Sequence, residues 1–221
     1  MTDDSITPAE FHSADGVEGW HVLYGGVQAH FPTGSFARGA ALVAAVGEIA
    51  AALGLEPEID LRPEGVTVRS SSLGPVQGIG PSDIELARRV SLAAGAVGSR
   101  PDDTRLHTLG IAVAQGEGAD TRDFWLAVLG YVRRNDAVII DPHGRGPRFW
   151  FDEVRSGATG RGRTHVDVAV PNEHAEARVA AAVAAGGRVA IDEDAPNWWG
   201  LASSDNHSVD IAGWVDVWDG R

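Results

Sequence analysis

The spacing of apolar and polar residues divides the chain into two blocks. In the first block, apolar residues recur at intervals of three and four from 36 to 53, which predicts a helix capped by Ser35 and ended by Gly54. A similar stripe predicts a second helix over 84–94, with its start at 81–83. Alternation with a period of two predicts short strands within 20–31 and over 65–70.

The second block has a different order of elements, and that order occurs twice. The first copy predicts a strand over 105–114, a helix over 120–129, and strands over 131–134, 137–141 and 148–154. The second copy predicts a strand over 163–170, a helix over 172–185, and strands over 188–192, 198–203 and 208–212. Arg105 and His107 in the first copy match Arg163 and His165 in the second. The block is therefore predicted to be a duplicated βαβββ unit.

These patterns predict an α+β protein with two folded parts. Residues 1–18 show no periodicity and are predicted to be a leader. Residues 95–103 are small, polar and contain proline, which is typical of a boundary between domains. We therefore expect a first domain over 19–96 and a second over 104–218.

Composition narrows the functional classes. The 221 residues are 43% hydrophobic and 22% charged, which is enough apolar material for a core. The net charge of −13 argues against a nucleic acid or an anionic membrane as partner. All 18 basic residues are arginines and no cysteine is present, so lysine Schiff bases, disulfides, thiolate ligands and cysteine nucleophiles are excluded. Without a signal segment or a long uncharged apolar run, the expected location is the cytoplasm.

The repeated histidines suggest a metal site. If the two copies pair about a pseudo-twofold axis, their first strands lie side by side, and His107 and His165 are expected to approach each other. Asp210, on the last predicted strand, would supply a carboxylate. Two imidazoles and one carboxylate form a three-ligand set that leaves positions on a divalent metal open for substrate oxygens.

Residues 104–214 resemble the vicinal-oxygen-chelate superfamily, which includes glyoxalase-like, bleomycin-resistance and ring-cleaving dioxygenase proteins. The resemblance rests on 123–130, Asp141-Pro142, 163–168 and 204–211. It implies metal ligands on the first and last strands of each copy, at the places of His107, Trp150, His165 and Asp210. Because tryptophan cannot ligate, the implied site is the three-ligand type of the dioxygenases, holding Fe, Mn, Zn or Ni.

Residues 20–94 resemble the pterin-4a-carbinolamine dehydratase family. The resemblance rests on the helix over 36–52 and on 55–59, 66–68 and 78–87, and it implies a small sheet with helices on one face. Active members carry a His-His-Pro triplet where this chain has Leu55, Glu56 and Pro57, and a further histidine that is replaced within 70–73. Dehydration needs general acid and base groups, so the resemblance implies a domain that has lost this activity.

Three functional hypotheses follow. The first is a metal-dependent lyase, isomerase or dioxygenase acting on a small molecule that chelates through neighbouring oxygens, in a homodimer as the resemblance implies. The second is a metal-free, drug-sequestering binding protein, and the third is a non-catalytic remnant. The reaction, the substrate and the catalytic residues stay open. Candidate pocket residues are Arg148, Trp150, Asp167, Trp198 and Trp199, with Trp214 and Trp218 as further aromatic candidates.

Overall fold

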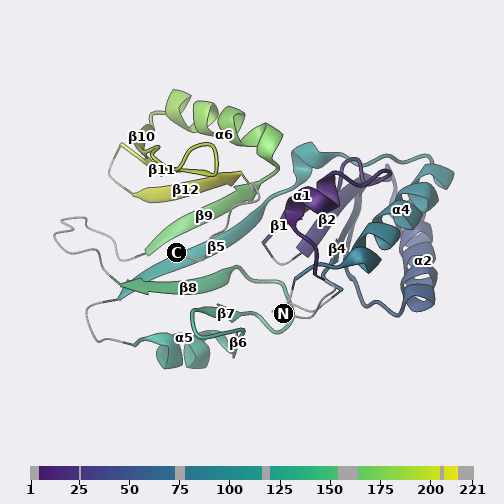
Figure 1. Cartoon of the computed structure of the whole chain (residues 1–221), viewed down its shortest axis with the longest axis horizontal. Coiled ribbons are helices and arrows are strands. Elements are labelled where there is room, and N and C mark those ends of the chain that lie inside the picture. The colour runs from purple at the N-terminus through teal and green to yellow at the C-terminus, as the bar shows by residue number, and fades with distance from the viewer. Residues whose placement is uncertain are drawn as a thin grey trace. The chain divides into compact units, whose positions relative to one another are not determined.

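The computed structural model describes residues 5–24, 26–72, 78–115, 120–153, 164–204 and 207–213 (Figure 1). Arg163, Trp214 and Trp218 lie outside these residues. The described chain forms two compact units, one ending at Leu106 and one spanning His107–Gly213. Each unit is described by itself.

The first unit is built on a four-stranded antiparallel sheet in the order β1-β2-β4-β3. The strands are β1 (His21–Leu23), β2 (Gly26–Pro32), β3 (Glu58–Arg62) and β4 (Gly65–Ser70). Alternate residues of β2 and β4, among them Phe31, Val66 and Val68, pack against helices α2 (Phe36–Leu53) and α4 (Pro81–Ala96). A small sheet with helices on one face is what the resemblance to the dehydratase family implied.

Helix α2 begins and ends at residues whose local chemistry defines its two ends. The Ser35 hydroxyl accepts a hydrogen bond from the Arg38 backbone N–H at the start, and Gly54 ends the helix with a left-handed φ of 67°. Leu42 and Val46 are fully buried in the core. Among the described residues, α2 alone is long and apolar enough to pass a length-and-composition test for a membrane span, a test that core helices also pass.

The structure corrects the prediction of a leader over 1–18. Residues Pro8–His12 form helix α1, and Phe11 on this helix is fully buried in the core of the first unit. A capping box starts the helix: Thr7 Oγ1 accepts from the Glu10 N–H, and Glu10 Oε2 accepts from the Thr7 N–H. Five residues are too few to show helical periodicity, so the apolar pattern missed this element.

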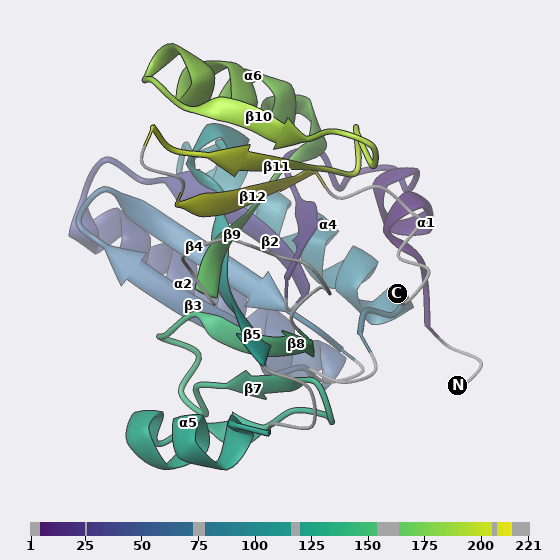
Figure 2. The same cartoon turned by 90° about the vertical axis from the view of Figure 1, so that its left-hand side faces the viewer.

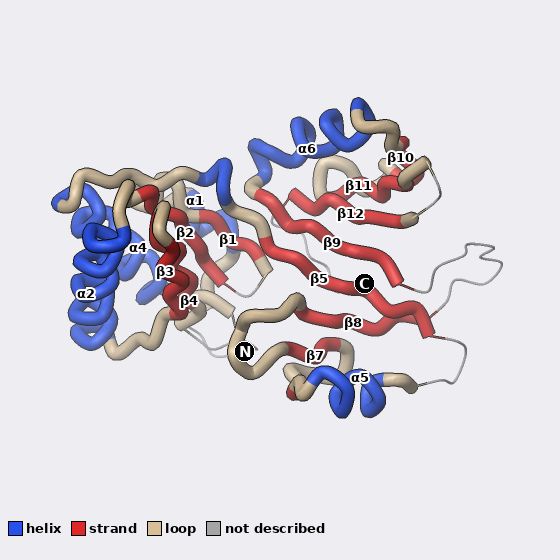
Figure 3. Tube along the Cα trace, turned by 180° about the vertical axis from the view of Figure 1, so that it is seen from behind, coloured by secondary structure: helices blue, strands red, loops and turns tan. Residues whose placement is uncertain are grey.

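The second unit is one eight-stranded sheet in the order β10-β11-β12-β9-β5-β8-β7-β6 (Figure 3). The first copy consists of β5 (Thr108–Gln115), α5 (Arg122–Leu129), β6 (Val132–Arg133), β7 (Val138–Ile140) and β8 (Arg148–Glu153). The second consists of β9 (Thr164–Val170), α6 (Asn172–Ala184), β10 (Arg188–Ile191), β11 (Trp198–Ala202) and β12 (Ser208–Gly213). This element order confirms the predicted duplication.

The two copies join through their first strands. Strand β5 pairs antiparallel with β9, and each first strand also pairs in parallel with the last strand of its own copy, β8 or β12. Helix α6 packs on Val170, Leu201 and Ile211, while α5 packs on Val113 and Phe149 (Figures 1 and 2). The strand register places all of these residues on one face of the sheet. The opposite face carries the candidate site.

Candidate metal centre

The helix-free face of the second unit brings three chemically active side chains together. His165 and Asp167 lie two residues apart on β9, so both point to this face. Asp210 on β12 is the direct parallel partner of Asp167 and points the same way. The register between β9 and β12, which the sequence alone does not contain, is therefore what assembles the group.

The three side chains are within reach of a single ion. His165 Nε2 lies 3.3 Å from Asp167 Oδ1 and 3.3 Å from Asp210 Oδ2. One ligand atom from each of the three residues lies within 4.8 Å of the other two. The Asp167 side chain is only 2% exposed, whereas His165 and Asp210 are 29% and 27% exposed. Asp167 is thus buried, whereas the side chains of His165 and Asp210 are partly accessible to solvent.

The electrostatics of the group favour a cation at its centre. The carboxylates of Asp167 and, to a smaller extent, Asp210 accept hydrogen bonds from the His165 imidazole and raise its pKa to about 10. Burial raises the pKa of Asp167, an effect that the neighbouring imidazole opposes. Two carboxylates that both face one imidazole nitrogen create a negative site, which holds a proton on His165 in the protein without a metal.

The described residues fit a divalent metal. Asp167 Oδ2 is buried and has no hydrogen-bond partner among the described atoms. A buried carboxylate oxygen left without a donor is costly unless something else satisfies it. One imidazole and two carboxylates form a three-ligand set that would leave open positions on the ion.

The structure brings His165 and Asp210 together but places His107 elsewhere. His165 pairs with Ala112 of β5, and His107 lies five residues before Ala112, which is about 17 Å along a strand. His107 also has the strand parity of Ile111 and Val113, which face the helices. Equivalent residues of two antiparallel strands meet only at the crossing point, and here that point is Gly110 opposite Asp167.

The predicted pocket residues divide between the two faces. Arg148, Trp150 and Trp198 share the parity of the helix-free face. The Arg148 guanidinium carbon lies 4.5 Å from the centroid of the Trp150 ring, a cation–π contact. Trp199 instead belongs to the core under α6 and is 9% exposed. Asp167, expected only as a pocket residue, takes the place in the ligand group that was expected for His107.

Asp167 could have been found from sequence by one signal. It stands two residues after His165, and a His-x-Asp spacing on a strand always places both side chains on the same face. The same alternation points Val166, which lies between them, to the opposite face of the sheet, where it is exposed. The pairing of Asp167 with Asp210 depends on the register between β9 and β12, and these two residues are 43 positions apart in the sequence. Periodicity does not define that register.

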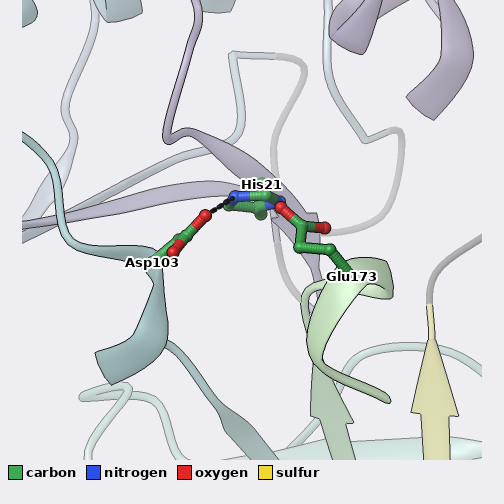
Figure 4. Close-up of side chains that lie close together, drawn as sticks. All are labelled: His21, Asp103 and Glu173. Carbon is green, nitrogen blue, oxygen red and sulfur yellow. Dashed lines mark hydrogen bonds and ion pairs between the residues drawn. The ribbon is translucent and has the colours of Figure 1, made fainter. Parts of the chain in front are cut away.

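The first unit holds a smaller polar cluster that sequence reasoning did not single out. His21 on β1 is 7% exposed, and its Nε2 lies 3.3 Å from Asp103 Oδ2 (Figure 4). Asp103 lies on the short 3₁₀ helix η1 (Asp103–Arg105), which follows α4. The imidazole of His12 on α1 is 5.5 Å from that of His21, between ring centroids, and its Nε2 accepts from the Val22 N–H. These contacts tie α1, β1 and η1 together.

The positions matched to the dehydratase triplet carry no acid–base group in a buried place. Leu55 packs against the core, and Glu56 is exposed. Beyond the strand, Ser70 and Ser72 donate to the buried Asp83 carboxylate at 2.6 Å and 2.5 Å. The backbone N–H groups of Ser72 and Gly80 also donate to it. The oxygens of Asp83 are thus used to join β4 to the start of α4.

Each of the two units is matched by a family model. The family model described as a glyoxalase-like domain matches residues 110–212. The family model described as pterin 4 alpha carbinolamine dehydratase matches residues 2–93. The chain therefore joins a pterin dehydratase-like unit to a glyoxalase-like unit.

Two solved structures resemble parts of the chain. A transcriptional coactivator/pterin dehydratase from Brucella melitensis is 23% identical, covers 42% of this chain and 100% of its own, and gives a TM-score of 0.38. A glyoxalase/bleomycin resistance protein/dioxygenase superfamily member from Vibrio splendidus 12B01 is 11% identical, covers 49% of this chain and 100% of its own, and gives a TM-score of 0.33. No curated protein matches the chain.

Proposed function

We propose that the glyoxalase-like unit is a metal-dependent enzyme that acts on a small molecule through two neighbouring oxygens. His165, Asp167 and Asp210 would hold one divalent ion, with Mn²⁺ or Fe²⁺ preferred. The observation that carries this proposal is the buried, unpartnered Asp167 Oδ2 within a group whose three ligand atoms lie within 4.8 Å of one another. A bound divalent ion would polarise substrate oxygens and stabilise the negative charge that develops on them.

The protein residues have separate tasks in this proposal. Two carboxylates balance the charge of a divalent ion, and the ion replaces the proton that His165 otherwise holds. Small, buried residues lie on the same face beside the ligands, namely Gly110 and Ala112 on β5 and Ala169 on β9. The chemistry of the site thus fits a lyase, isomerase or dioxygenase, among which an activity screen has to choose.

Metal analysis tests the proposal directly. After incubation with Mn²⁺, Fe²⁺ or Zn²⁺ and removal of excess ion, the wild-type protein is expected to retain one ion per chain. The His165→Ala variant should retain far less, because it loses the only imidazole of the group. His143→Ala is the matched control, since His143 is exposed in a turn. Equal metal content in wild type and His165→Ala would refute the site.

A specific observation supports a second candidate function, metal-free ligand binding. The protonated His165 already meets both carboxylates at 3.3 Å, so the group can be stable as an ion pair without a metal. Trp150 and Trp198 would then contact an aromatic ligand. Ligand-induced change in tryptophan fluorescence that persists in excess chelator, together with no stoichiometric metal, would favour this function over the first.

We further propose that the dehydratase-like unit has no dehydratase activity. Leu55 offers no proton-transfer group, Glu56 is an isolated exposed carboxylate, and Asp83 is occupied by four donors. The experiment is a turnover assay with a pterin carbinolamine, and the expected rate equals the uncatalysed rate. Turnover that scales with protein concentration would contradict this part of the proposal.

A further inference from the structure

Residues 99–106, the last part of the first unit before β5, run along the edge of β2. The Asp102 N–H donates to the His30 carbonyl at 2.8 Å, and the Ser99 hydroxyl donates to the Pro32 carbonyl at 2.7 Å. Strand β1 pairs with the earlier part of β2, so these residues continue the edge where β1 stops. We call residues 99–106 the connecting segment, because in the sequence they lead directly into the second unit.

His30 is the buried side chain at this contact. The residue is 7% exposed, and its Nδ1 lies 2.9 Å from Thr67 Oγ1. Its Nε2 is buried and has no hydrogen-bond partner among the described residues. A Cβ atom built on Gly65 would lie 2.8 Å from Nε2, so the Gly65 backbone packs in direct contact with the ring. A neutral imidazole with its proton on Nδ1 fits this environment, because a proton on Nε2 would need an acceptor there.

Charged groups from both sides of β2 act on this imidazole. Arg105 on η1 exerts the largest of these charge effects and opposes protonation. The carboxylates of Asp102, Glu64 and Asp60 favour protonation, each with a smaller effect. Burial outweighs all of these charges and lowers the pKa of His30. The repulsive charge thus stands on the connecting segment, whereas β3 and the turn that follows it present attractive charges.

We infer that the connecting segment is an acid-sensitive element: when His30 takes up a proton, residues 99–106 leave β2 while the four-stranded sheet stays folded. A charged imidazole needs water or an acceptor at Nε2. Gly65 is held in place, because it pairs with both β2 and β3. The connecting segment is irregular apart from the short η1, and its Arg105 repels the imidazolium. The segment is therefore the element that moves.

The inferred change is a local opening, and it does not depend on the proposed metal function. Irregular segments with few buried contacts open at a lower free energy than the whole fold. The opening would begin below the ordinary histidine pKa of about 6.5. Acid would then join the two units through a longer and more flexible stretch of chain without unfolding the first unit.

Hydrogen–deuterium exchange of the full chain tests the inference between about pH 7 and about pH 5, with rates corrected for the intrinsic effect of pH. In wild type, the protection of amides in the connecting segment should fall by up to about tenfold per pH unit below about pH 6.5. Amides of β4 should keep their protection. His30→Asn, which is polar but cannot be protonated, should show no such fall.

Two exposed arginines of the connecting segment give a matched pair of variants. Arg105→Gln removes the repelling charge and should lose less protection, whereas Arg100→Gln should behave as wild type. Unchanged protection of the segment in acid would overturn the inference, as would an equal loss in His30→Asn. It would also be overturned if β4 lost protection together with the segment, because the whole unit would then be unfolding, or if Arg105→Gln lost as much protection as wild type.

Discussion

Replacing Asp167 by asparagine is the sharpest test of the proposed metal centre. The substitution keeps the shape of a side chain that is 2% exposed, so packing is preserved while one negative charge is removed. A doubly charged ion next to one carboxylate gains about 8 kcal/mol of Coulomb energy at 4 Å and an effective dielectric constant of 20. Desolvation and displaced water offset most of this gain. The amide oxygen remains a weaker ligand, so we expect a net loss of about 3 kcal/mol, or roughly 100-fold in metal affinity.

The assay is competition against a metal-buffering chelator, with Mn²⁺ and Zn²⁺ measured separately. Asp152→Asn is the matched control, because Asp152 is an exposed carboxylate on β8, on the same face and outside the ligand group. It should bind metal within about twofold of wild type, a difference well below 1 kcal/mol. The reasoning is refuted if Asp167→Asn binds as tightly as wild type, or if Asp152→Asn weakens binding equally.

Three further predictions concern the first unit. Burial lowers the pKa of His30 in the folded protein below the unfolded value of about 6.5. Neutral His30 therefore contributes fully to stability above about pH 6.5. This contribution is lost as the pH falls from about 6.5 toward the lowered pKa, by at most about 1.4 kcal/mol per pH unit. Urea unfolding at several pH values should therefore show a steeper loss below pH 6.5 in wild type than in His30→Asn, and equal slopes would contradict this. Phe11→Ala should lower the free energy of unfolding by about 3–5 kcal/mol, because Phe11 is fully buried; a change near zero would restore the idea of a leader. Asp83→Asn should lower the free energy of unfolding by about 2–4 kcal/mol, because the amide NH₂ of asparagine would face the hydroxyl donors of Ser70 and Ser72. Thermal or urea unfolding measures this, and an unchanged midpoint would show that the hydrogen bonds to Asp83 are dispensable.

Local signals in the sequence predicted much of the fold. Helix α2 has the predicted bounds because its cap, its apolar stripe and its terminal glycine all lie within one continuous segment. Strand β4 likewise spans 65–70 as predicted. The duplicated unit was visible because the order of elements repeats along the chain. Helix α1 was missed, although Thr7, Pro8 and Glu10 form a capping signal that could have revealed it.

The site was less predictable, because it depends on strand register. The match of His107 to His165 was wrong in the structure, because the antiparallel first strands cross with Gly110 opposite Asp167, and this register points the two histidines to opposite faces of the sheet. A shift of one residue reverses the face to which a side chain points, and His107 has the parity of the helix-covered face. Asp210 and His165 meet because β12 runs parallel to β9 with Asp210 level with Asp167, a long-range fact.

The two copies of the duplicated unit contribute different side chains to one row across four adjacent strands, made of Arg148, Gly110, Asp167 and Asp210. Across the crossing of β5 and β9, the second copy contributes two acids where the first contributes a glycine and a cation. Had both halves kept the same side chains, a bound molecule could turn end for end without penalty. Opposite charges on the two halves remove that degeneracy, so a polar molecule bound to this face would have one preferred orientation, and a reaction there would act on one of its ends.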